Sequence, residues 1–190
     1  MIRHLPNLLS ALRLLAAPFA AWLIVNQHDI AAVLTFAAAG ASDGLDGFVA
    51  RRWGVTSAFG AWLDPVADKL LMLFCFSALY LVGATPLWLV AVVVARDLAI
   101  VAGWLLIKLL SLPTPTAPLF IGKLSTLAQI LYIFTLLLLL SFDVEAPRLV
   151  LAAAWACGAF VVLSAAAYAG NFLRGFFRES GPRDPAGAPA

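Results

Sequence analysis

The chain has 190 residues, of which 64% are hydrophobic and 12% charged, and its formal net charge is +2. Soluble domains average about 45–50% apolar and about 25% charged residues, so this composition predicts one domain that uses a lipid bilayer as its solvent. The small charge and the lack of basic clusters interleaved with aromatic residues argue against nucleic acid as a partner. Cys75 and Cys157 lie inside apolar runs and form no CxxC motif, so we expect buried thiols.

Six apolar segments are near or above the roughly 20 residues that cross a bilayer. Cut at turn signals, they cover 8–26, 30–51, 57–82, 85–109, 121–142 and 148–172. We therefore predict an all-α, polytopic integral membrane protein with six transmembrane helices around a polar cavity that faces the cytoplasm. Residues 1–178 are expected to form the membrane domain, entered directly without a cleaved leader. Residues 179–190 are expected to be a disordered tail.

Lysine and arginine gather on one side of the membrane in this arrangement. The residues on that side are Arg3, Arg51, Arg52, Lys108, Lys123, Arg174, Arg178 and Arg183. The opposite loops hold mainly Asp29, Asp143 and Glu145, with Arg148. By the positive-inside rule both termini are cytoplasmic.

The stretch from Asp43 to Asp68 places four carboxylates, at Asp43, Asp46, Asp64 and Asp68, inside this apolar chain. An ionised group in hydrocarbon costs roughly 2.5–3.5 kcal/mol on insertion scales and is by default functional. At 100° per residue each helix presents two of the carboxylates on one face. Oxygen ligands suit a divalent cation bound together with substrate phosphates, so a shared metal site is predicted. The alternative is a set of salt bridges with Arg51, Lys69 and Arg96.

The spacing D-x-x-D-G-x-x-A-R, eight residues, then G-x-x-x-D-x-x-x-D is matched at every fixed position, from Asp43, Asp46, Gly47, Ala50 and Arg51 to Gly60, Asp64 and Asp68. It resembles the signature of the CDP-alcohol phosphotransferases, membrane enzymes of phospholipid synthesis. The resemblance covers about residues 4–172. It implies a donor, CDP-diacylglycerol, two divalent cations, Mg²⁺ or Mn²⁺, and a homodimer.

The resemblance also implies roles for individual residues. Asp43, Asp46 and Asp64 would be metal ligands, and Asp68 would be both a ligand and the general base. The group implied to hold the cytidine diphosphate comprises Asn7, Asp43, Asp46, Gly47, Ala50, Arg51 and Ser57. Three of these have plainer interpretations, because Asn7 and Ser57 can be helix caps and Arg51 an interfacial anchor like Arg52.

Arg96 and Lys123 are further cations near the predicted membrane level, and we expect them to bind the phosphate of an anionic acceptor. The alternative is that Arg96 neutralises the aspartates and Lys123 anchors the interface. Arg96 and Asp97 are neighbours in sequence, so we expect them not to pair and each to face a different helix.

Short marks at the N-terminus, at Arg96-Asp97 and from Ile121 to Gln129 are similar to the CMP-forming cardiolipin synthases, whose acceptor is phosphatidylglycerol. The alternative interpretation is a resemblance to the related phosphatidylglycerophosphate synthases, whose acceptor is glycerol 3-phosphate. A cation channel or transporter lined by the aspartates is the alternative from another class, although no internal repeat of the kind common in carriers is evident.

Overall fold

The computed structural model describes the backbone of residues 5–53, 58–109 and 120–179, and side chains within 11–42, 65–109 and 120–172. The described chain is helical apart from short turns. It forms six helices, α1 (Leu5–Val25), α2 (Asp29–Trp53), α3 (Ala58–Leu81), α4 (Leu87–Leu109), α5 (Phe120–Ser141) and α6 (Pro147–Glu179). The all-α prediction is confirmed, and the predicted bounds agree within a few residues except that α6 extends beyond 172 to Glu179.

Three of the turns between helices are built in the same way. Gln27, Gly83 and Asp143 have positive φ angles of 59°, 77° and 49°. At each of them the following N–H donates to a carbonyl five residues earlier, as from His28 to Leu23 and from Val144 to Leu139, both at 2.9 Å. This is the Schellman ending of a helix, which satisfies the last carbonyl groups. Because these endings close α1, α3 and α5, they all lie at the end of the bundle opposite the aspartate motif.

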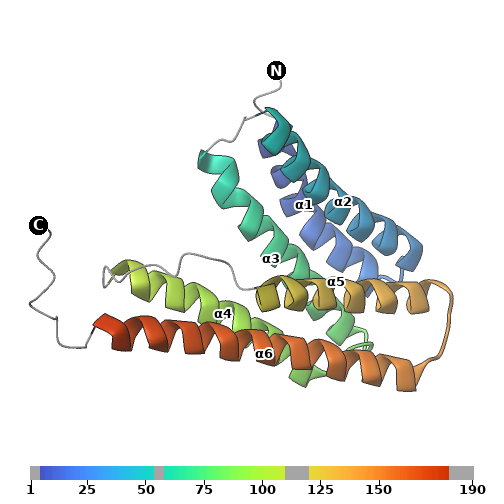
Figure 1. Cartoon of the computed structure of the whole chain (residues 1–190). Coiled ribbons are helices and arrows are strands. Elements are labelled where there is room, and N and C mark those ends of the chain that lie inside the picture. The colour runs from blue at the N-terminus through green and yellow to red at the C-terminus, as the bar shows by residue number, and fades with distance from the viewer. Residues whose placement is uncertain (1–4, 54–57, 110–119, 180–190) are drawn as a thin grey trace, which may run out of the picture.

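α1 lies between α2 and α3 and packs on both, while α6 runs alongside α4 and α5 (Figure 1). The buried stripe of α1 consists of Arg13, Ala17, Ala20 and Ile24, all at most 2% exposed. Alanines in this stripe let a neighbouring helix approach closely, which is how helices associate in lipid. α5 also contacts α2 and α3, so it joins the two groups of helices.

Large apolar side chains also cover the outside of the molecule. Examples on α1 and α4 are Leu15, Trp22, Leu98, Val101 and Trp104, all more than half exposed. Apolar surface on this scale is unusual for a soluble monomer. Among the described residues, three stretches are long and apolar enough to cross a membrane, namely Leu87–Leu109, Phe120–Ser141 and Pro147–Phe172. The chain is therefore a membrane protein, and the count of six spans stays a prediction.

Two smaller predictions concern the thiols and the helix termini. Cys75 and Cys157 are buried and free, as expected. α1 begins at Leu5, so Asn7 lies in its first turn, and α3 begins at Ala58, directly after Ser57. The predicted linker at 113–118, Ser57 itself and most of the predicted tail lie outside the described residues.

Candidate active site

The four aspartates of the motif lie on two helices that the fold holds together. Asp43 and Asp46 belong to α2, whereas Asp64 and Asp68 belong to α3, as predicted. α1 packs on both helices, so it fixes their relative position. The side chain of Asp68 is half-buried. The side chains of Asp43, Asp46 and Asp64 lie outside the described part, as do those of the predicted nucleotide contacts Asn7, Gly47, Ala50, Arg51 and Ser57.

The predicted metal site depends mainly on those undescribed side chains. In the part of the chain whose side chains are described, no group of three or more His, Cys, Asp or Glu residues comes together, and only Asp68 of the four aspartates belongs to that part. The backbone does place the four oxygen-donor residues within the last three turns of α2 and the first three of α3. Carboxylates are ligands that Mg²⁺ and Mn²⁺ accept, so this donor set fits the predicted ions and the metal site stays a prediction.

Arg13 is a charged residue that sequence reasoning left without a role. It is only 2% exposed, on the buried stripe of α1. A guanidinium at that depth needs negative charge or hydrogen-bond acceptors around it. Since α1 packs on α2 and α3, Arg13 places a permanent positive charge in the group of helices that carries the four aspartates. Its position in an otherwise apolar helical stripe was the signal in the sequence.

A second charged group joins α3, α4 and α6. Asp97 Oδ1 accepts hydrogen bonds from Lys69 Nζ at 2.8 Å and from Arg96 Nη1 at 2.6 Å. Arg96 Nη2 donates to Ser164 Oγ at 2.9 Å, and the guanidinium carbon lies 5.8 Å from the centre of the Tyr168 ring. The prediction that Arg96 and Asp97 do not pair is wrong, because the long Arg96 side chain folds back to its neighbour. The expectation that each also reaches another helix is confirmed.

Among the described side chains, Lys69 and Arg96 both bind Asp97. The alternative in which these cations neutralise the motif aspartates concerns mainly side chains outside the described part, so it stays a prediction. Arg96 is buried at 6% exposure, whereas Lys123 is exposed near the start of α5. The two predicted contacts of the acceptor phosphate therefore differ in their access to a ligand.

Tyr168 brings the beginning of α5 against α6. A Cβ atom added to Gly122 would lie 2.8 Å from the Tyr168 hydroxyl oxygen and 3.1 Å from ring atom Cε2. The absence of a side chain at Gly122 thus lets the tyrosine lie directly over the α5 backbone. The next buried polar residues on this helix are Ser125 and Gln129, both fully buried, with Gln129 Nε2 donating to Ser125 Oγ at 3.4 Å.

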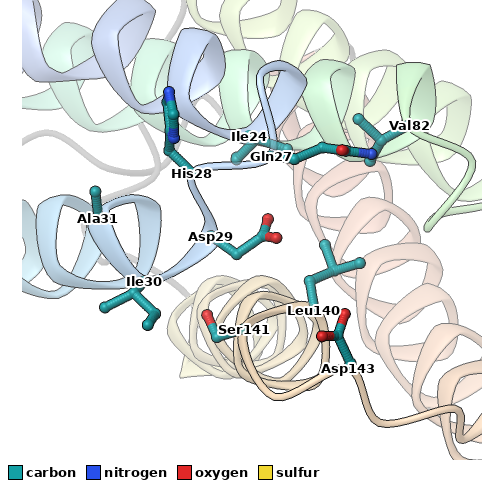
Figure 2. A pocket seen from close by; sticks show the side chains of 10 residues that line it. All are labelled: Ile24, Gln27, His28, Asp29, Ile30, Ala31, Val82, Leu140, Ser141 and Asp143. Carbon is teal, nitrogen blue, oxygen red and sulfur yellow. The ribbon is translucent and has the colours of Figure 1, made fainter.

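A cavity of about 670 Å³ lies at the other end of the bundle, where α1, α2, α3 and α5 meet their turns. Figure 2 shows His28, Asp29 and Asp143 among its lining residues. His28 is exposed and lies beside Trp22, with the ring centres 5.7 Å apart. Because this cavity is separated from the motif by the length of the helices, it belongs to the opposite surface of the molecule. His28 therefore lies far from the motif aspartates.

The fold and the charged groups together define a polytopic α-helical membrane protein with ionisable side chains gathered between its helices. A model of the CDP-alcohol phosphatidyltransferase family matches residues 3–164, and the chain belongs to this family. The resemblance drawn from the motif is therefore confirmed.

Three relatives illustrate the similarity. The CDP-diacylglycerol–glycerol-3-phosphate 3-phosphatidyltransferase 1 of Oryza sativa chloroplasts is 36% identical over 159 residues, covering 75% of this chain and 48% of the rice protein. The CMP-forming cardiolipin synthase of Rattus norvegicus is 33% identical over 178 residues, covering 85% of this chain and 59% of the rat protein. The CDP-diacylglycerol–glycerol-3-phosphate 3-phosphatidyltransferase of Escherichia coli K12 is 36% identical over 144 residues, covering 70% of this chain and 76% of the Escherichia coli protein. The chain thus spans about half the length of the rice and rat proteins.

Proposed function

We propose that this protein is a phospholipid-synthesising enzyme that transfers a phosphatidyl group from CDP-diacylglycerol to phosphatidylglycerol, forming cardiolipin and CMP. The observation that carries the proposal is the family match over 3–164 on a chain whose four motif aspartates lie on two helices held by α1. Family membership also argues against the channel or transporter alternative, for which the glycine and arginine positions of the motif would be incidental.

In the proposed reaction, Asp68 accepts the proton of the acceptor hydroxyl. The hydroxyl oxygen then forms a bond to the phosphorus that carries diacylglycerol, and the bond from that phosphorus to CMP breaks, so that CMP leaves with the electron pair. Asp43, Asp46, Asp64 and Asp68 would hold two divalent cations, which supply neutralisation of the phosphate charge and stabilisation of the leaving oxygen. Positioning and electrostatics provide most of the catalysis in phosphoryl transfer. A direct displacement needs no protein nucleophile.

The remaining roles concern binding. Arg51 would hold the diphosphate through its fork of donors, with Asn7, Gly47, Ala50 and Ser57 around the nucleotide. Arg96 and Lys123 are proposed for the phosphate of the acceptor. The acyl chains of the donor would stay in the bilayer while its head group enters from the cytoplasmic side, where both termini are proposed to lie. A homodimer is proposed from the family resemblance.

The second candidate acceptor is glycerol 3-phosphate, which would make the protein a phosphatidylglycerophosphate synthase. The similarity to the rice and Escherichia coli 3-phosphatidyltransferases favours this acceptor. The similarity to the rat cardiolipin synthase favours the first candidate.

One experiment tests both candidates. Purified protein in liposomes is incubated with radiolabelled CDP-diacylglycerol and Mg²⁺ or Mn²⁺, with each acceptor supplied separately, and the lipid products are resolved by thin-layer chromatography. Cardiolipin is expected with phosphatidylglycerol. If phosphatidylglycerophosphate formed from glycerol 3-phosphate and no cardiolipin formed from phosphatidylglycerol, the second candidate would replace the first. If no alcohol released CMP, the enzymatic proposal would be wrong.

A further inference from the structure

Lys69 and Asp97 are charged residues in the middle of long helices for which the reaction proposed above has no assigned use. Lys69 is the twelfth residue of α3, so at 1.5 Å per residue it lies about 17 Å from the start of the helix. Asp97 is the eleventh residue of α4. Ionised groups at such depth are costly and mark functional sites by default.

The charges of this cluster do not cancel among its three members. Lys69 and Arg96 share one carboxylate oxygen, Oδ1 of Asp97, which leaves a surplus of one positive charge. Arg96 makes the shorter contact, 2.6 Å against 2.8 Å, and its side chain is 5% exposed. It also donates to Ser164. Arg96 and Asp97 are therefore the mutually neutralised pair, in which Arg96 is buried and Asp97 half-buried.

The surplus charge is consequently placed on Lys69, whose side chain is 39% exposed. A lysine ammonium is a compact point charge on a flexible stem and a common ligand of phosphate. Lys69 also follows Asp68 directly, 1.5 Å further along the axis of α3. One turn of this helix thus carries both the proposed base and an accessible cation, with Cβ directions about 100° apart around the axis.

We propose that Lys69 binds the anionic phosphate of the acceptor and that Asp97 is a positioning residue that holds the ammonium in place. Asp97 is itself held by Arg96, which also donates to Ser164. This inference rests on the proposed function and adds Lys69 to the acceptor contacts. The shared chemistry is a phosphate ester next to a free hydroxyl, which occurs as a phosphodiester in phosphatidylglycerol and as a phosphomonoester in glycerol 3-phosphate.

The test compares Lys69→Met with Lys69→Arg, and with Lys108→Met as the matched control. Lys108 is an exposed cation at the end of α4, with its Nζ 5.4 Å from the centre of the Trp104 ring. Initial rates are measured in liposomes at saturating CDP-diacylglycerol, with phosphatidylglycerol in one series and glycerol 3-phosphate in the other. Loss of a charge-assisted hydrogen bond corresponds to about a tenfold change in affinity or more.

We expect Lys69→Met to raise the KM of the acceptor about tenfold, and to leave the KM of CDP-diacylglycerol and the kcat within about twofold. Lys69→Arg keeps the charge and should restore most of the affinity, and Lys108→Met should behave as the wild type. Asp97→Asn should raise the acceptor KM in the wild-type background but add little to Lys69→Met, because a positioning residue has nothing left to position. Asp97→Glu should recover part of the loss.

A second readout separates this inference from the proposed function. Glycerol 3-phosphate is titrated into the donor-free protein, and the thermal unfolding midpoint is followed for the wild type and Lys69→Met. If neither acceptor supports transfer but glycerol 3-phosphate raises the unfolding midpoint only when Lys69 is present, the proposed reaction is refuted and the binding of phosphate by Lys69 is supported. If transfer occurs but Lys69→Met changes neither the acceptor KM nor the midpoint response, Lys69 does not bind the acceptor. An inactive protein without Lys69-dependent stabilisation would overturn both.

Discussion

Gly122 offers a direct test of how α5 packs on α6. In Gly122→Ala the new methyl group would lie 2.8 Å from the Tyr168 hydroxyl oxygen and 3.1 Å from Cε2, both inside normal contact distance. Either the tyrosine ring moves away or the helices separate. Overpacking of this kind costs about 1–3 kcal/mol. Movement of the ring also weakens its contact with the Arg96 guanidinium, now 5.8 Å from the ring centre, which is a contact worth about 0.5–1 kcal/mol.

The matched control is Gly103→Ala on α4, where an added methyl group meets no atom within 4 Å. Both substitutions gain about 0.5–1 kcal/mol from the better helix propensity of alanine. Their difference therefore isolates the packing against Tyr168, and because the hydroxyl is the tip of a half-buried side chain we expect the lower part of the range, about 1–2 kcal/mol.

The assay is the unfolding midpoint of both variants in the same detergent. Gly122→Ala should unfold several degrees below Gly103→Ala, at about 2–4 °C per kcal/mol for a chain of this size. Adding Tyr168→Phe removes the closest atom and should recover at least about 0.5 kcal/mol as a coupling energy. Equal midpoints for the two alanine variants, with no coupling to Tyr168→Phe, would show that Tyr168 does not pack on Gly122.

Three further predictions concern other parts of the molecule. Gly83→Ala should lower the free energy of unfolding by about 1–2 kcal/mol, because alanine would have to adopt the φ of 77°. The added methyl group itself would meet no atom within 4 Å. An unfolding midpoint equal to that of the wild type would contradict this. Tyr132→Phe should lower the free energy of unfolding by about 1–3 kcal/mol, because the buried Thr85 hydroxyl, which lies 2.5 Å from the tyrosine oxygen, would lose its hydrogen-bond partner. Adding Thr85→Val should recover much of this loss, and a double variant no more stable than Tyr132→Phe would exclude this cause. Asp68→Asn should abolish release of CMP from labelled CDP-diacylglycerol while leaving the unfolding midpoint close to that of the wild type, and substantial residual turnover would remove Asp68 from the role of base.

The charged network shows where reasoning from sequence reaches its limit. Spacing along one helix argued against a bond between Arg96 and Asp97, because adjacent residues point about 100° apart. That argument considers Cβ directions, whereas the arginine side chain is long enough to bend back to its neighbour. The three-helix cluster of Lys69, Asp97 and Ser164 could not be foreseen, since the residues are separated by 28 and 67 positions in the chain.

The sequence by itself determined the membrane class, the six helices with nearly their full bounds and the family. The reason is physical: apolar runs, turn residues and a motif of eight fixed positions are local properties, and in lipid the backbone must form helices to satisfy its hydrogen bonds. Only the tertiary structure decided that α1 holds the two aspartate helices together and that Arg13 lies on the buried stripe of α1. It also decided that Asp97 joins Lys69 to Arg96, because partners across helices depend on which faces meet, and the pattern of any single helix leaves that choice open.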